Sequence, residues 1–218
     1  MNIAIDGPAG AGKSTIAKRV SKKLGYVYVD TGAMYRTMAL YFLRNKIDGS
    51  DEAAVSASLD DVSVEIKYVD GEQKVLLNKE DVTGLIRTEE VGNMASATSK
   101  YSAVREKLLE LQRDLARKMD VVMDGRDIGT TILPDAEVKI YLTASVDARG
   151  QRRYDELKAR GVECDLEQIK KDIEDRDYRD MHREVSPLKQ AADAYYLDSS
   201  DMDIDEVTEA IIQRIKER

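Results

Sequence analysis

Residues 7–14, near the start of the chain, read Gly7-Pro8-Ala9-Gly10-Ala11-Gly12-Lys13-Ser14, which has the form G-x-x-x-x-G-K-S. This pattern is typical of a loop whose glycines let successive backbone N–H groups turn toward phosphate oxygens. Residues 2–6 before it read as a short buried strand, and residues 14–24 after it have apolar side chains at helical spacing. This strand–loop–helix order is the setting that the motif requires, so we expect the chain to bind a nucleoside triphosphate.

The last two residues of this loop have specific expected roles. The ammonium group of Lys13 would reach the β- and γ-phosphates, and the hydroxyl of Ser14 would ligate Mg²⁺. A second, acidic ligand for the metal would have to follow an apolar strand. Asp124 and Asp127 are the two candidates for that role.

The composition restricts the class of protein. A chain of 218 residues can form one α/β domain with a small insertion. The net charge of −8 argues against non-specific binding to a nucleic-acid polymer, and no apolar run is long enough to span a membrane. The single cysteine, Cys164, excludes an internal disulfide. We therefore expect a cytoplasmic protein without nucleic-acid or membrane partners, and we expect a monomer.

Short apolar runs alternate with helical stretches, which predicts an α/β fold with a five-stranded parallel sheet flanked by helices. The strands are expected at residues 2–6, 26–30, 121–124, 137–144 and 195–198. The helices are expected at residues 14–24, 32–45, 102–118, 146–160, 166–183 and 204–216.

One segment departs from this alternation. Residues 62–68 and 74–78 look like two strands joined through Asp70-Gly71, a dipeptide that favours a hairpin turn. Because an antiparallel hairpin does not belong inside a parallel α/β unit, we predict a small inserted subdomain at residues 60–95. The core domain would then consist of residues 1–59 and 96–218. The insert either covers the second substrate or is a structural embellishment.

A second nucleotide-binding pattern in this segment is interpreted as a coincidence. Asn78-Lys79-Glu80-Asp81 matches the N-K-x-D motif with which GTPases read guanine. A GTPase also has a D-x-x-G motif between its phosphate loop and N-K-x-D, whereas the nearby match, residues 81–84, comes afterwards and shares Asp81. The order of the motifs therefore argues against a GTPase.

Polar residues follow two of the expected strands, where ligands of open parallel sheets bind. Thr31 could donate to an acceptor oxygen and Arg36 would point into the same crevice, although Asp30 or Thr31 could also simply cap the next helix. After the third strand, Arg126 offers a planar fork to phosphate, and Asp127 can accept from a nucleobase or orient an arginine. The alternative there is an ordinary connecting loop.

The expected helix at residues 166–183 changes character along one face. Leu166, Ile169 and Ile173 form an apolar stripe, and the same phase continues through Arg176, Asp180 and Arg183, with Arg179 beside it. On a solvated face these charges would be ordinary i,i+4 pairs. The phase instead turns them inward, where one aspartate cannot balance three arginines and bound phosphates would.

Arginines are frequent in this part of the chain, and arginine suits bidentate binding of phosphate. We predict an arginine-rich lid at about residues 149–168 that closes over the nucleotide. The arginines of the wider stretch are Arg149, Arg152, Arg153, Arg160, Arg176, Arg179 and Arg183.

Taken together, the motifs resemble those of the bacterial cytidylate kinase family. They are GPAGAGKST, DTGAMYR, ASATSKYSAVRE, MDGRDIGT and RDYRDMHREVSPL, in order along nearly the whole chain. The resemblance implies a nucleoside-monophosphate-kinase fold and transfer of the γ-phosphoryl group of ATP to CMP or dCMP, with Mg²⁺. It also implies that residues 60–95 are the family's inserted monophosphate-binding subdomain.

The resemblance assigns roles to individual residues. Gly7 to Thr15 would hold the phosphates of ATP. Arg36, Arg126 and Arg183 would hold the CMP phosphate, and Ser96, Arg105 and Asp127 would contact cytosine. Arg176 and Asp180 would hold the ribose, and Thr31 stands where many relatives have serine, near the cytidine nucleotide. The catalytic set would be Lys13, Arg126, Arg176, Arg179 and Arg183, which stabilise charge on the phosphoryl group in transit.

Two alternatives stay open. The first is a kinase for another small acceptor, such as UMP or a hydroxyl compound, for which Asp30 or Asp127 could act as the general base. The second is a non-catalytic nucleotide-binding regulator, against which the missing GTPase motifs argue.

Overall fold

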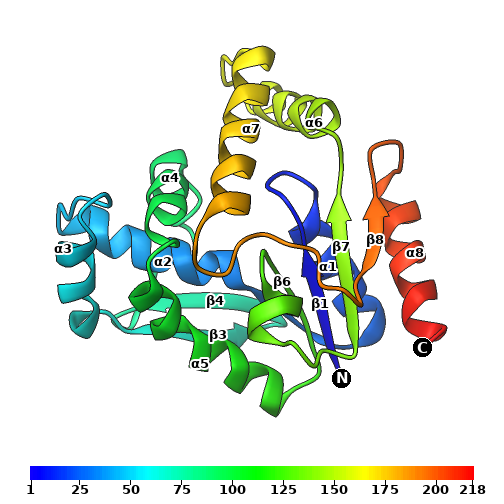
Figure 1. Ribbon diagram of the computed structural model, residues 1–218, viewed down its shortest axis with the longest axis horizontal. Coiled ribbons are helices and arrows are strands. Elements are labelled where there is room, and N and C mark those ends of the chain that lie inside the picture. Colours follow the sequence, from blue (N-terminus) through cyan, green and yellow to red (C-terminus); the bar gives the residue numbers. More distant parts are fainter. The chain divides into compact units, whose positions relative to one another are not determined.

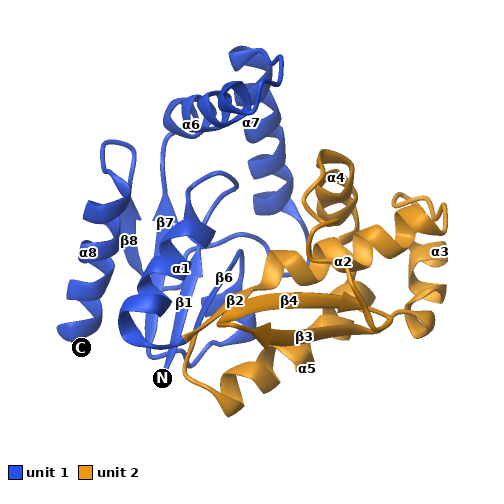
Figure 2. Cartoon of the chain, turned by 180° about the vertical axis from the view of Figure 1, so that it is seen from behind, with its two compact units in different colours: residues 1–26, 122–218 blue, residues 27–121 orange.

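The computed structural model describes all 218 residues, which divide into two compact units (Figure 2). The first unit consists of Met1–Tyr26 and Val122–Arg218, and the second is Val27–Val121. The strands of the main sheet follow the order β2-β6-β1-β7-β8, and a smaller sheet has the order β3-β4-β5 (Figure 1).

Parallel strands form the centre of the first unit. They are β1 (Asn2–Asp6), β6 (Val121–Gly125), β7 (Val138–Thr143) and β8 (Tyr195–Asp198). β1 pairs with β7 and β7 pairs with β8, both in parallel. Ile3, Ala4 and Ile5 are all fully buried. A run of apolar side chains buried on both faces is typical of a central strand in a parallel sheet.

The helices of the first unit pack in two pairs. α1 (Lys13–Leu24) packs against α8 (Ile204–Lys216), and α6 (Val146–Ala159) packs against α7 (Leu166–His182). Figure 1 shows α6 and α7 beyond the carboxyl end of β7. Side-chain caps start α6, α7 and α8, and at the start of α7 the carboxylate of Asp165 accepts the backbone N–H of Gln168. This pairing brings α7 to the end of the sheet at which ligands bind in this class of fold.

The second unit contains the antiparallel sheet. β3 (Val64–Val69) and β4 (Glu72–Leu77) form a hairpin, and β5 (Glu80–Asp81) pairs with β4. Asp70 and Gly71, the two residues of the turn, both have positive φ, as a two-residue hairpin of this type requires.

The rest of the second unit is one strand and four helices, together with η1 (Leu59–Asp61), a short 3₁₀ turn. β2 (Val27–Asp30) leads directly into α2 (Thr31–Arg44), which packs against α4 (Glu89–Thr98) and α5 (Ser102–Lys118). α3 (Glu52–Ala57) precedes η1. Each helix of the chain is too short or too polar to cross a membrane.

The predicted fold class is confirmed. All five strands of the parallel sheet and all six predicted helices are present, with ends that differ by two residues or fewer from those expected. The hairpin is also present, and residues 60–95 contain β3, β4 and β5. The boundaries of the inserted subdomain and of the lid stay a prediction.

Five elements were not expected: α3, η1, β5, α4 and the π-helical turn η2 (Ile128–Ile132). α3 is only six residues long, and Gly92 lowers the helical propensity of α4. η2 owes its shape to a distant residue, Asp6, whose carboxylate accepts the backbone N–H groups of Ile128 and Gly129. No local pattern reports such a contact.

The N-K-x-D pattern has a structural explanation in the second unit. Asn78 ends the hairpin: its side chain accepts the backbone N–H of Ser63 and donates to the carbonyl of Asp61. Asn78 and Lys79 both have positive φ in the turn between β4 and β5. The asparagine therefore serves the turn, which agrees with interpreting the motif as a coincidence.

Candidate active site

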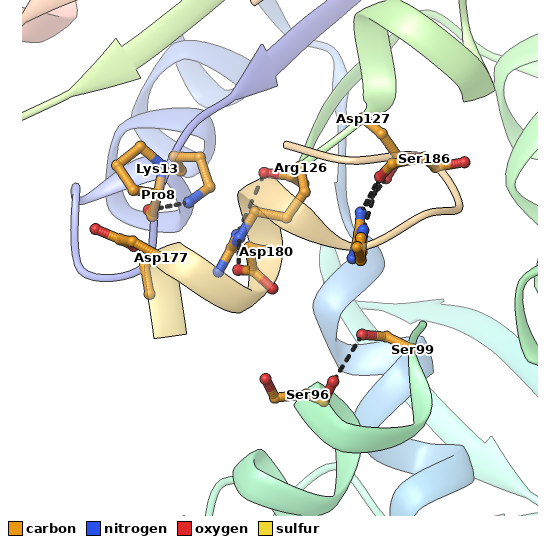
Figure 3. Close-up of polar contacts among 12 residues, drawn as sticks. Pro8, Lys13, Ser96, Ser99, Arg126, Asp127, Asp177, Asp180 and Ser186 are labelled. Carbon is orange, nitrogen blue, oxygen red and sulfur yellow. Dashed lines mark hydrogen bonds and ion pairs between the residues drawn. The ribbon is translucent and has the colours of Figure 1, made fainter. Parts of the chain in front are cut away.

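The phosphate loop connects β1 to α1, as the motif requires. Gly7, Gly10 and Gly12 all have positive φ, which is the backbone conformation that favours glycine. Lys13 begins α1 and is buried, and its Nζ donates to the carbonyl of Pro8 at 2.6 Å (Figure 3). Burial, assisted by the charge of Arg126, holds the pKa of Lys13 well below its usual value. The lysine therefore lies folded over its own loop.

Ser14 has a carboxylate partner. Its hydroxyl donates to Oδ2 of Asp124 at 2.9 Å, and Asp124 is buried near the end of β6. Of the two acidic candidates for a second metal ligand, Asp124 is thus the one that contacts Ser14. A hydroxyl and a carboxylate are the oxygen donors that Mg²⁺ prefers, so this pair fits the ion.

Asp6 connects the start of the phosphate loop to the segment that follows β6. Its carboxylate accepts the N–H of Ile128 at 2.8 Å and that of Gly129 at 2.7 Å. Burial raises the pKa of Asp6 to about 6, although the two backbone donors act in the opposite direction. Sequence reasoning missed this residue. The signal available was its position at the carboxyl end of β1, directly before the glycine-rich loop.

Helix α7 presents two aspartates to the site. Asp177 and Asp180 are buried, and Nε of Arg126 donates to Oδ2 of Asp180 at 2.9 Å (Figure 3). Burial alone would raise the pKa of Asp180, but Arg126, Arg176 and Arg183 outweigh it and hold the pKa below its usual value. The face of α7 predicted to turn inward does so at Asp180.

The charge count made for this helix was incomplete. Arg126 pairs with Asp180, and Arg183 lies 3.5 Å from Asp127. Asp177, which the sequence analysis did not consider, forms a third pair with Arg149. Arg126, Arg149 and Arg183 therefore have carboxylate partners within the protein, so the count of one aspartate against three arginines left out Asp127 and Asp177. Of the remaining candidates, Arg176 is half-buried and Arg179 is exposed.

In the second unit, Asp30 organises a group of polar side chains at the start of α2. Its carboxylate accepts the N–H of Ala33 at 2.8 Å. Asp30 therefore caps α2, as the sequence analysis allowed for Asp30 or Thr31. It also pairs with Arg36 at 3.0 Å and with Arg87 at 2.7 Å. Burial would raise the pKa of Asp30, but the two guanidinium groups outweigh it and lower the pKa. Arg87 was not identified from the sequence.

The remaining candidates of the second unit lie on α2, α4 and α5. Thr31 is buried in the first turn of α2. The Arg105 guanidinium lies over the ring of Tyr35, 5.5 Å from its centroid, and donates to the carbonyl of Ser99. The hydroxyl of Ser96 is buried without a hydrogen-bond partner, while its carbonyl accepts from Ser99 (Figure 3). An unpaired buried hydroxyl is costly unless a ligand completes it, so Ser96 suits a ligand contact.

Comparison with known proteins identifies the family. The model of the family described as cytidylate kinase matches residues 3–217. The chain belongs to the cytidylate kinase family. The cytidylate kinase of Lactobacillus gasseri is 52% identical over 218 residues, which is all of this chain and 95% of that protein. The cytidylate kinase of Caldicellulosiruptor saccharolyticus is 50% identical over 213 residues, or 98% of this chain and 94% of that protein.

Solved structures of other proteins are similar to this member of the cytidylate kinase family in their fold. An uncharacterized protein from Eubacterium ventriosum has a TM-score of 0.56 and 14% identity, covering 100% of this chain and 99% of that chain. Shikimate kinase from Bacteroides thetaiotaomicron has a TM-score of 0.50 and 14% identity, and the match covers 100% of this chain and 97% of that chain. At this identity the likeness concerns the fold alone.

Proposed function

We propose that the chain transfers the γ-phosphoryl group of ATP to the phosphate of CMP or dCMP, producing ADP and CDP or dCDP. The observation that carries this proposal is the family match over residues 3–217, a range that contains the whole phosphate loop. The resemblance of the motifs, noted from the sequence, supports the same substrates.

The donor ATP belongs to the first unit in this proposal. Backbone N–H groups of residues 7–15 bind its phosphates, and Lys13 leaves the Pro8 carbonyl to reach the β- and γ-phosphates. Ser14 and Asp124 hold Mg²⁺, directly or through water. When bound, the ion neutralises charge on the transferred group. A lid at about residues 149–168 excludes water, which would otherwise hydrolyse ATP.

The family resemblance assigns contacts with the acceptor nucleotide to named residues, which we give for each unit by itself. In the second unit we assign Thr31, Arg36, Ser96 and Arg105, of which Ser96 has the free hydroxyl. In the first unit we assign Arg126 and Arg183 to the phosphate, Asp127 to cytosine, and Arg176 and Asp180 to the ribose. Arg36, Arg126 and Arg183 each pair with a carboxylate, so acceptor phosphate competes with Asp30, Asp180 and Asp127 for them.

Catalysis then needs positioning and charge neutralisation rather than a base. The acceptor is already an anionic phosphate oxygen, which attacks the γ-phosphorus while the bond to the β-phosphate oxygen breaks. Lys13 and the guanidinium groups of Arg126, Arg176, Arg179 and Arg183 stabilise the equatorial oxygens during transfer. The proposal also includes a monomer located in the cytoplasm, where a lone cysteine stays reduced.

A substrate panel tests this function. ADP release from ATP is measured with CMP, dCMP, UMP, AMP and the hydroxyl compound shikimate. We expect kcat/KM with CMP or dCMP to exceed that of every other acceptor by at least about tenfold, since a site built to hydrogen-bond one base leaves polar groups unpaired with another. Equal rates with UMP, or a preference for a hydroxyl acceptor, would contradict the assignment.

A further inference from the structure

Arg149 lies at the start of the predicted lid, and its side chain is bonded to the protein. It is only 4% exposed. Its guanidinium donates to the carbonyl of Ala9 at 2.9 Å and to that of Ala144 at 2.9 Å, and it pairs with Oδ2 of Asp177 at 2.6 Å. One side chain of α6 therefore joins the phosphate loop, the end of β7 and helix α7.

The contact with Ala9 bears on the geometry of the phosphate loop. In a planar trans peptide the C=O and the following N–H point in opposite directions. Because the Ala9 carbonyl points at Arg149, the N–H of Gly10 points away from it. Gly10 has positive φ and packs on Arg149: a Cβ placed there would lie 3.5 Å from Cβ of the arginine. Arg149 thus holds one peptide of the loop whose N–H groups bind phosphate.

Asp177 holds Arg149 in turn, and at a cost. Its Oδ1 is buried and has no hydrogen-bond partner. A buried ion pair with an unsatisfied oxygen adds little to stability compared with apolar side chains of similar size. Asp177 lies on α7, one turn from Asp180, which pairs with Arg126. The pair therefore connects the helix of the proposed acceptor contacts to the loop of the donor.

We propose that Arg149 and Asp177 are a positioning pair for the donor nucleotide, deepening the proposed function, on which this inference rests. Arg149 keeps the peptide between Ala9 and Gly10 in the orientation that binds phosphate, and Asp177 keeps Arg149 in place. Neither side chain contacts the reacting atoms. The pair ties the conformation of the phosphate loop to the position of α7.

Binding measurements on three variants test the pair. Asp177→Asn and Arg149→Lys each keep the size of the side chain but weaken the pairing. Calorimetry should show that each substitution raises the Kd for ADP about tenfold, which is the effect of losing one good hydrogen bond. The Kd for CMP should change by less than about twofold. The matched control is Lys170→Gln, which removes the exposed pair between Lys170 and Asp147 across the same two helices but leaves the phosphate loop untouched. It should bind ADP as the wild type does.

A double variant separates positioning from stability. Arg149→Met combined with Asp177→Leu replaces the ion pair by apolar side chains of similar volume, so the melting temperature should fall only by the cost of the two hydrogen bonds that the Ala9 and Ala144 carbonyls lose. We expect its affinity for ADP to stay weak. Recovery of ADP affinity together with stability would overturn the proposal, because the pair would then be merely structural.

Two other results would also overturn it. Unchanged ADP affinity in Asp177→Asn would show that the loop does not depend on the pair. Tighter ADP binding by that variant would mean that Asp177 restrains an arginine which itself binds ATP. Failure of the proposed function is distinguishable from both, since wild-type protein would then bind ADP normally but transfer no phosphate to CMP.

Discussion

At the scale of single residues, several of the polar groups proposed to bind nucleotide already have partners in the protein. Lys13 donates to the Pro8 carbonyl, and Ser14 donates to Asp124. Arg126 and Arg183 are paired with Asp180 and Asp127. Nucleotide binding therefore exchanges one set of polar contacts for another, which keeps these charges satisfied while the site is empty of substrate.

Lys13 gives the first prediction. Lys13→Ala should lower kcat by about 10²–10³-fold, the loss typical when one donor to the transition state is removed. The melting temperature should not fall, because the substitution removes a buried charge. Lys22→Ala, in the exposed last turn of the same helix, is the control and should keep wild-type turnover. Near-normal turnover by Lys13→Ala would refute the assignment of the loop.

Asp127 tests the recognition of the acceptor. Asp127→Ala should weaken binding of CMP by about 1–3 kcal/mol, the range for a lost hydrogen bond to a charged group. The KM for ATP should stay unchanged. Asp135→Ala, an exposed carboxylate shortly after η2, serves as the control. If instead only the dependence of the rate on ATP changes, Asp127 has been given the wrong role.

Asp6 predicts how stability depends on pH. Burial raises its pKa from 3.8 to about 6 in the folded protein, so between these values the folded state holds a proton that the unfolded chain has released. The free energy of unfolding should therefore fall by about 3 kcal/mol as the pH rises from about 4 to about 6. The difference between wild type and Asp6→Asn in urea titrations isolates this effect, because asparagine does not titrate. A difference independent of pH would contradict the raised pKa.

At the scale of elements, the phosphate loop depends on how closely β1 and β7 approach. A Cβ at Gly7 would lie 1.9 Å from the carbonyl oxygen of Leu142 in β7, and that oxygen belongs to the backbone. Gly7→Ala should therefore push the loop off the sheet, lowering the free energy of unfolding by about 3 kcal/mol, the upper end for overpacking, and weakening ADP binding.

Gly25→Ala is the matched control for Gly7→Ala. Gly25 ends α1 with φ 71°, but a Cβ there meets nothing within 4 Å. It should cost only the strain of a left-handed residue, about 1 kcal/mol, and leave ADP binding intact. Comparable unfolding energies and ADP affinities for the two variants, measured by urea titration and calorimetry, would contradict the argument from close approach.

Local patterns predicted most of the elements and only part of the site. The phosphate loop, the Asp70-Gly71 hairpin and the polar face of α7 are local in sequence, so each could be recognised. Asp6 contacts Ile128 across 122 residues, and Arg149 contacts Ala9 across 140. Those contacts arise when parallel strands bring distant segments to one edge of the sheet, which no short pattern records. Arg149 was consequently named only as part of the arginine-rich stretch, and its bonds to Ala9 and Asp177 were not predicted.

At the scale of the whole molecule, each compact unit contains its own set of proposed nucleotide contacts. The first unit contains the complete phosphate loop and α7, and the second contains Thr31, Arg36, Ser96 and Arg105. Within the first unit α1 packs against α8 and α6 packs against α7, and within the second unit α2 packs against α4 and α5. All the proposed contacts of the donor ATP therefore lie within the first unit.

The transfer itself is tested most directly by following the phosphoryl group. ATP labelled with radioactive phosphorus in its γ-phosphate is incubated with wild-type protein, Mg²⁺ and CMP, and the products are separated by chromatography. We predict label in the β-phosphate of CDP, in an amount equal to the ADP formed. Label released as inorganic phosphate, or ATP left unconsumed in the presence of CMP and dCMP, would contradict it.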